Sequence, residues 1–177
     1  AAAFFEYDLE KNLVEIEQEL KDETYQLGGY HSFRIDKPKK RLVNAAPFRD
    51  RVLHHALMNV IEPLFERQFI FDSYANRKGK GTHAALDRCT YYLRRYKYVM
   101  HLDVRQFFPS IDHQILLSIL SRSIADQRAM NLIRKIIASG NGVQADEYDM
   151  VYFPNDDIFS ASRARGLPIG NLTSQNW

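Results

Sequence analysis

The stretch YVMHLDVRQFFPSIDH, residues 98–113, constrains the fold of this chain most strongly. It opens with a short apolar run, formed by Val99, Met100 and Leu102, of the kind found in a central β-strand. The run ends on Asp103. A carboxylate buried at a strand end costs several kcal/mol unless it has a hydrogen-bonded cap, an ion pair or a metal ion. The pattern therefore predicts a strand that holds Asp103 at the edge of a site, although a local turn or cap is the commoner role of such an aspartate.

Four segments have the apolar spacing of helices. Residues 6–23 predict an amphipathic surface helix, and residues 48–69 predict a helix interrupted near Pro63. A third helix is expected after Thr82, which is a suitable N-cap residue, and a fourth after Asp112, whose carboxylate suits the same role.

A basic hairpin is expected between the first two helices. Phe33 and Ile35 alternate with polar neighbours, residues 36–38 have turn character, and Leu42-Val43 begins a return strand. Arginine and lysine therefore lie on and around a protruding two-stranded tip.

The distribution of charge is more informative than its total. Residues 1–33 hold eight acidic and two basic residues, a net charge of −6, so the remainder of this +2 chain carries +8. The basic residues cluster in segments 34–41, 76–80, 94–97 and 163–165. Clusters of this kind suit a polyanion, because each neutralised phosphate releases condensed counterions. Any one cluster alone also fits a solvated loop or helix face.

Length and composition limit the class of protein. A chain of 177 residues with 45% hydrophobic content fits one domain or two small subdomains that share a core. No apolar run approaches the roughly 20 residues that span a bilayer. A single cysteine, Cys89, excludes an internal disulfide framework, and no signal peptide is evident. These features predict an intracellular, cytoplasmic protein without membrane contact.

Three sequence features resemble functional sites but are expected to have other roles. His54 and His55 are adjacent, so they face different directions on a helix and packing or capping is their expected role. The sequence KGKGT at 78–82 departs from the phosphate-binding P-loop, because a glycine separates the lysine from the threonine. The acidic FPNDD at 153–157 is expected to be a solvated turn.

Four segments in order resemble the successive motifs of reverse transcriptases. They are RLVNAAPFRDRVLHHAL, DSYANRKGKGTHAAL, YVMHLDVRQFFPSIDH and RGLPIGNLTSQNW. The resemblance implies an α/β (α+β) fold, with the fingers and part of the palm, and an antiparallel palm sheet backed by helices. It also implies a nucleotidyltransferase that adds dNTPs to a DNA or RNA primer on an RNA template. An accessory protein partner is compatible with the resemblance.

The resemblance implies a division of the chain. Residues 1–80 would form the fingers, residues 81–113 the palm helix and the strand with Asp103, residues 114–165 connecting helices and a hairpin, and residues 166–177 the start of the fourth motif. The family's Tyr-x-Asp-Asp hairpin and thumb would follow Trp177, so this chain is expected to be inactive alone.

The fourth motif indicates which branch of the reverse transcriptases the chain resembles. Its sequence IGNLTSQ at 169–175 is similar to that of diversity-generating retroelement enzymes, which copy a template RNA with errors at adenines. Group II intron-like, retron and phage-defence reverse transcriptases are the alternatives within the family. A non-catalytic nucleic-acid-binding module, with a structural Asp103, is the alternative from another class.

The resemblance implies a metal site. Asp103 would be the catalytic carboxylate and, with the carbonyl of Val104, would bind Mg²⁺, two ions of which serve the complete enzyme. Asp156 and Asp157 would not substitute for the missing carboxylates, because they precede the fourth motif.

The resemblance also implies contacts to substrates. Lys40 or Arg41 would contact the triphosphate, and Phe108 would exclude a ribose 2′-hydroxyl from beneath the incoming sugar, with Phe107 either beside it or in the core. Ile169 and Gly170 would complete the nucleotide site. The residues expected to bind template or primer are Lys39, Arg77, Lys78 and Lys80.

Overall fold

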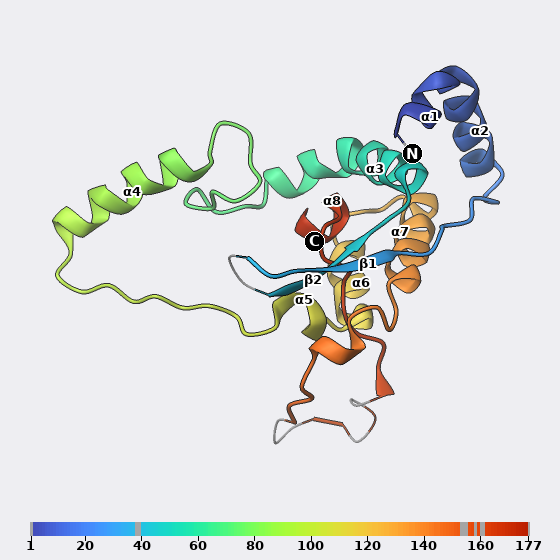
Figure 1. Ribbon diagram of the computed structural model, residues 1–177. Coiled ribbons are helices and arrows are strands. Elements are labelled where there is room, and N and C mark those ends of the chain that lie inside the picture. Colours follow the sequence, from blue (N-terminus) through green and yellow to red (C-terminus); the bar gives the residue numbers. More distant parts are fainter. Residues whose placement is uncertain (1, 38–39, 153–155, 158, 160–161, 177) are drawn as a thin grey trace.

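The computed structural model describes residues 2–37, 40–152, 156–157, 159 and 162–176, and it has a mixed α/β fold (Figure 1). Its elements are α1 (Ala2–Tyr7), α2 (Leu9–Lys21), β1 (His31–Ile35), β2 (Arg41–Ala45), α3 (Phe48–Glu66), α4 (Thr82–Arg95), α5 (Phe107–Ser110), α6 (His113–Ser121), α7 (Gln127–Ser139), a 3₁₀ turn (Ala145–Glu147) and α8 (Leu172–Asn176). The expected α/β class is confirmed. Of the helices described here, none has the length and apolar character to cross a membrane.

Helix α3 is the centre of the core. Its buried residues recur at helical spacing along one face, and they include Leu53, Leu57, Met58 and Ile61. The part of this face formed by Leu57, Met58 and Ile61 packs against apolar side chains of α6 and α7. Together they form the main cluster, whose other members include Leu116, Leu120, Ile133, Ile137 and Leu167. A second cluster joins Leu53 to Phe5, Ile16 and Tyr25.

The acidic N-terminal segment is held to the core by cations of α3 and α7. Arg49 donates two hydrogen bonds to the Glu19 carboxylate, at 2.8 and 3.0 Å, and they lower the pKa of Glu19. Arg128 donates to the carbonyl of Lys21 at 2.6 Å, and Lys135 to that of Glu23 at 2.9 Å. The charge asymmetry of the sequence therefore serves, in part, internal packing.

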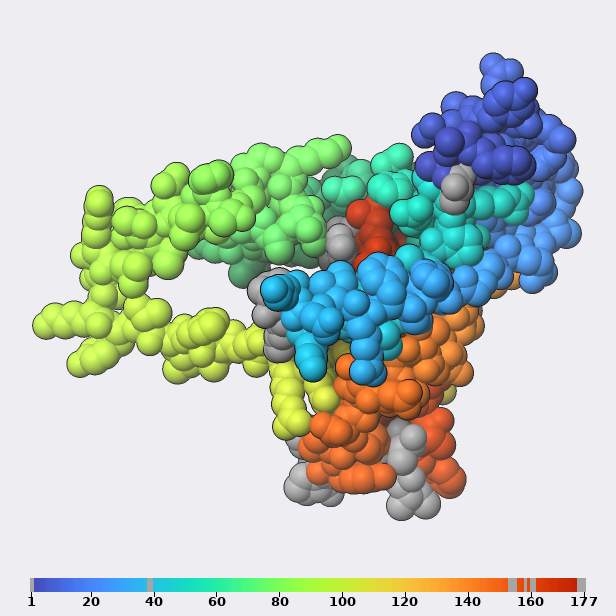
Figure 2. All heavy atoms as spheres, in the orientation of Figure 1, coloured from blue at the N-terminus to red at the C-terminus, as the bar shows by residue number. Residues whose placement is uncertain are grey.

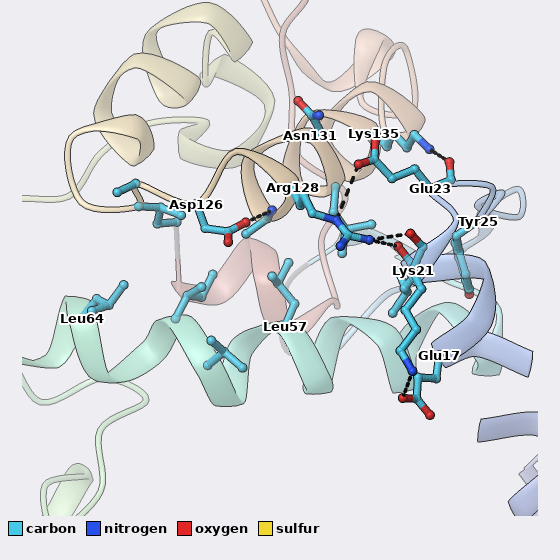
Figure 3. A pocket seen from close by; sticks show the side chains of 17 residues that line it. Glu17, Lys21, Glu23, Tyr25, Leu57, Leu64, Asp126, Arg128, Asn131 and Lys135 are labelled. Carbon is cyan, nitrogen blue, oxygen red and sulfur yellow. Dashed lines mark hydrogen bonds and ion pairs between the residues drawn. The ribbon is translucent and has the colours of Figure 1, made fainter. Parts of the chain in front are cut away.

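An apolar groove of about 520 Å³ lies between α2, α3 and α7 (Figure 3). Leu57 and Leu64 of α3 face it, and Arg128 and Lys135 stand at its rim. Both cations already bind α2 and the segment after it, so the rim braces the N-terminal helices against α7.

The predicted hairpin is confirmed. β1 and β2 pair antiparallel, with His31 opposite Ala45 and Ile35 opposite Arg41. All five residues of β1 are exposed, whereas Asn44 of β2 is fully buried. The hairpin therefore contacts the body of the protein mainly through β2.

The prediction of a strand before Asp103 is wrong. Residues 98–104 form no strand, and the side chains of Val99, Met100 and Leu102 are 71%, 80% and 80% exposed. A strand requires a neighbouring backbone to satisfy its N–H and C=O groups, and no described segment pairs with this one. The expected hairpin in the 114–165 region is also missing from its described part, where Arg165 forms only a single bridge with Asp112.

Two helix boundaries differ from expectation. Helix α3 continues through Pro63 to Glu66, although a proline inside a helix removes one i→i−4 hydrogen bond. Helix α4 has Gly81, not Thr82, at its N-cap, and the positive φ of 89° at Gly81 explains the use of glycine there.

Helix α4 and the segment after it project away from the rest of the molecule (Figure 1). No residue of α4 is buried. The loop before it braces α4 through Arg88, which donates to Asp72 at 2.8 Å and lowers the pKa of that carboxyl.

Candidate functional site

Three segments that are distant in sequence meet beside α3: strand β2, the third-motif residues 107–113 and the fourth-motif residues 164–174. Figure 2 shows the C-terminal segment, in red, between the blue hairpin and the teal α3. Helix α8 packs against α3. The meeting point of the three segments is the candidate site.

Backbone hydrogen bonds join the third and fourth motifs. Leu167 donates to the carbonyl of Phe108, and Gly166 to that of Ile111, both at 2.9 Å. The buried ring of His113 places its Nε2 2.7 Å from the carbonyl oxygen of Gly166. These bonds fix where α5 lies relative to residues 166–170.

The fourth motif is joined to the hairpin by Asn44 and Asn171. The Asn44 amide donates to the carbonyl of Ile169 at 2.8 Å, and the Asn171 side chain donates to the carbonyl of Asn44 at 2.9 Å. The Asn171 side-chain oxygen accepts from the Ala46 amide at 3.3 Å. One side chain therefore satisfies two backbone groups at the end of β2, and both asparagines are buried.

The Asn44 side chain extends this network. It donates to Ser32 Oγ at 2.8 Å and accepts a hydrogen bond from the buried side chain of Gln144. None of Asn44, Gln144 and Asn171 was predicted as a site residue. The one sequence signal was a polar residue inside the apolar return strand, at Asn44.

Gly170 lies against β2 in a conformation that other residues avoid. Its φ is +106°, and a Cβ atom added to it would lie 2.9 Å from Val43 Cγ1. Ile169 and Gly170, both predicted for the nucleotide site, are thus held directly over the hairpin strand.

The two phenylalanines of α5 have different surroundings. Phe108 is partly buried and packs against the main core cluster, whereas Phe107 is 46% exposed. Their rings contact edge to face, with centroids 5.3 Å apart. The exposed ring is therefore Phe107, one residue before the position expected to lie beneath a sugar.

Asp103 and Val104 lie on the exposed segment before α5. In the described part of the chain, the Asp103 carboxylate has no hydrogen-bond or ion-pair partner, so its oxygens are free for a ligand. The described residues contain no cluster of three or more His, Cys, Asp or Glu side chains able to hold a metal. Asp103 alone is compatible with Mg²⁺ only where waters and substrate phosphates complete the coordination.

The predicted cations differ in their availability. Lys40 and Arg41 are exposed at the end of the hairpin, and Lys39 lies outside the described residues. Lys78 is exposed on the loop before α4. The remaining two, Arg77 and Lys80, are engaged within that loop.

Arg77 acts as a tether in this structure. It forms hydrogen bonds to the Glu66 carboxylate at 2.6 and 3.0 Å and to the carbonyls of Ile70 and Ser73. Lys80 donates to the carbonyl of Phe71 at 2.7 Å and lies over its ring. Of the loop cations predicted for template or primer, Lys78 is therefore the one with an exposed and uncommitted head group.

Sequence comparison agrees with the order of motifs. A family model described as reverse transcriptase (RNA-dependent DNA polymerase) matches residues 32–174. The chain is 31% identical over 146 residues to an uncharacterized 91 kDa protein in a cob intron of Schizosaccharomyces pombe, a match that covers 81% of this chain and 18% of that protein.

Two further relatives have names that refer to introns. The group II intron-encoded protein LtrA of Lactococcus lactis subsp. cremoris is 26% identical over 134 residues, 74% of this chain and 22% of that protein. Nuclear intron maturase 1, mitochondrial, of Arabidopsis thaliana is 28% identical over 86 residues, 49% of this chain and 12% of that protein. The chain thus spans less than a quarter of the length of these three relatives.

The fold joins a basic hairpin to the third and fourth motifs through backbone hydrogen bonds. The extent of the family match makes the assignment definite, and the chain belongs to the reverse transcriptase family.

Proposed function

We propose that the protein is an RNA-directed DNA polymerase that adds dNTPs to a primer on an RNA template. The observation that carries this proposal is the bond from the backbone amide of Asn44 to the carbonyl of Ile169, because it joins β2, the strand that begins at Arg41, to the fourth motif. This contact joins the cationic hairpin to the segment that the family uses at the nucleotide.

The residues present support specific roles in phosphoryl transfer. Lys40 or Arg41 would bind the triphosphate and neutralise part of its charge. Asp103, with the carbonyl of Val104, would hold Mg²⁺, which when bound stabilises the charge on the transferring phosphate. The Phe107–Phe108 ring pair would limit the space beneath the sugar, with Phe107 as its accessible member.

Replacement of Asp103 tests the proposal. In the full-length protein, Asp103→Asn should lower primer extension on RNA by about a hundredfold or more, because several kcal/mol of charge stabilisation at the phosphate depend on the metal ligand. Primer extension with radiolabelled dNTP and Mg²⁺ is the measurement. Asp87→Asn, at an exposed aspartate of α4, is the matched control and should leave the rate unchanged.

The outcome separates the enzyme from a binding module. Equal extension by wild type and Asp103→Asn would contradict the catalytic assignment. RNA binding without extension by any form of the full-length protein would favour a non-catalytic RNA-binding module, with the cations as its interface.

Within the reverse transcriptase family, we propose that the protein is a diversity-generating retroelement enzyme. The fourth-motif sequence IGNLTSQ at 169–175 supports this branch. The names of the intron-encoded relatives support a group II intron-like enzyme as the second candidate. Sequencing of the cDNA product separates them, because errors concentrated at template adenines are expected only of the first.

A further inference from the structure

A polar cavity lies between α3 and the fourth-motif turn at 170–172. It has a volume of about 300 Å³, and its lining residues are Arg51, His54, His55, Gly170, Asn171 and Leu172. Positions 51, 54 and 55 have i, i+3 and i+4 spacing, so all three face the same side of α3. The adjacency of the two histidines therefore did not prevent them from sharing one cavity.

The buried member of this set is His54, which is 1% exposed. Within the described part of the chain, neither of its ring nitrogens has a hydrogen-bond partner. Burial lowers the pKa of His54 to about 4, so at neutral pH the ring is uncharged and carries one N–H donor. A buried donor without a partner is costly, which makes a ligand in the adjoining cavity the simplest explanation.

The neighbouring acid is not the missing partner. Asp50, one turn earlier in α3, accepts hydrogen bonds from Tyr25 Oη and the Gly28 amide, both at 2.8 Å. Asn171 is also occupied, because its side chain binds the backbone of Asn44 and Ala46. Neither neighbour therefore supplies a hydrogen bond to His54, which leaves a ligand in the cavity as the candidate partner.

The charge of the lining defines the ligand. None of the six described lining residues is acidic, and Arg51 brings an exposed guanidinium that packs on the Phe48 ring at 5.2 Å. A guanidinium offers donors only, and His54 adds a neutral donor in a fixed position. A compact anion with several acceptor oxygens fits this arrangement, as a phosphate does.

We propose that this cavity binds a backbone phosphate of a nucleic-acid strand through Arg51 and His54. The inference rests on the proposed function, since it supplies the strand. Gly170 borders both the cavity and β2, so a strand held here passes directly beside the fourth motif. Arg51 supplies the charge, and His54 fixes the position of the phosphate by one directed hydrogen bond.

Histidine ring NMR on the 177-residue chain tests the contact directly. Titration with a short single-stranded RNA should shift the ring ¹⁵N and ¹H signals of His54, while those of exposed His83, on α4, stay in place. An oligonucleotide of the same sequence with uncharged methylphosphonate linkages should leave His54 unchanged. Inorganic phosphate, at higher concentration, should reproduce part of the shift.

Variants measure the energetic consequence at low salt. His54→Phe, which keeps a ring without nitrogens, and Arg51→Gln should each weaken RNA binding about tenfold, the effect of one hydrogen bond to a charged group. Arg51→Gln should also reduce the slope of log affinity against log salt by about one. Arg67→Gln, an exposed arginine just after α3, is the matched control for loss of charge.

The outcomes separate this proposal from the proposed function. Tight RNA binding that leaves His54 signals unmoved, with full affinity in both variants, would overturn the cavity assignment and leave the polymerase proposal intact. A His54 shift with phosphate but not with RNA would overturn the assignment to a strand. No RNA binding by wild type at low salt would overturn the proposed function itself. If His54→Phe does not fold, the wild-type titration and Arg51→Gln decide.

Discussion

At the scale of single residues, Gly170 shows how closely the fourth motif is fitted to the hairpin. Its positive φ and its distance to Val43 both exclude a side chain. The two effects are separable, because the first depends on the backbone of Gly170 and the second on the neighbouring valine.

Gly170→Ala should therefore lower the free energy of unfolding by about 1–3 kcal/mol, through strain at positive φ and a clash with Val43. Urea unfolding followed by circular dichroism measures the change. Adding Val43→Ala to this variant should relieve the clash but not the strain.

Gly29→Ala is the control, since a Cβ there has nothing within 4 Å. Equal stability of Gly170→Ala and wild type would show that the 168–172 turn adjusts freely, against the close fit described above.

At the scale of elements, helix α6 depends on its N-cap residue, Asp112. The Asp112 carboxylate accepts hydrogen bonds from the amides of Gln114 and Ile115, at 2.8 and 3.1 Å. Its other oxygen lies 3.7 Å from the Arg163 guanidinium. Asp112 thus joins the start of α6 to the segment that leads into the fourth motif.

Replacement of Asp112 by alanine should destabilise the protein by about 1–2 kcal/mol, the usual effect of losing an N-cap. Asp112→Asn should retain most of that stability, because asparagine also caps helices while losing only the ion pair. Thermal unfolding of both variants, compared with wild type, is the measurement. An asparagine variant as unstable as the alanine variant would assign the effect to Arg163 instead of the cap.

At the scale of the whole molecule, the chain has a packed body and a projecting arm (Figure 1). The body is formed by α3, α6 and α7 around their shared apolar cluster. The arm consists of α4 and residues 96–104, which expose apolar side chains and contribute nothing to that cluster. A 14-residue helix without buried residues is near the limit of independent stability.

Hydrogen exchange should reveal this difference. Amides of α4 are expected to exchange at least about a hundredfold faster than those of α3 and α7, because they open without loss of the core. Mass spectrometry of peptic fragments at neutral pH provides the measurement, with α3 as the internal reference. Equal protection of α4 and α3 would show that the arm is packed in solution.

The sequence by itself determined the local elements and the family. Alternation at Phe33 and Ile35 predicted the hairpin, helical spacing predicted α2 and α3, and Asp112 predicted the start of α6. These signals are local because backbone propensity, capping and turn chemistry act over a few residues.

Only the tertiary structure decided which distant groups meet. Asn44 contacts Gln144 and Asn171 across 100 and 127 residues, and His54 shares a cavity with the turn at 170–172. Such pairings depend on packing and loop closure, which no periodicity encodes. The same reason explains the failed strand at 99–102, since its apolar residues fit a strand but a strand forms only where another backbone lies beside it.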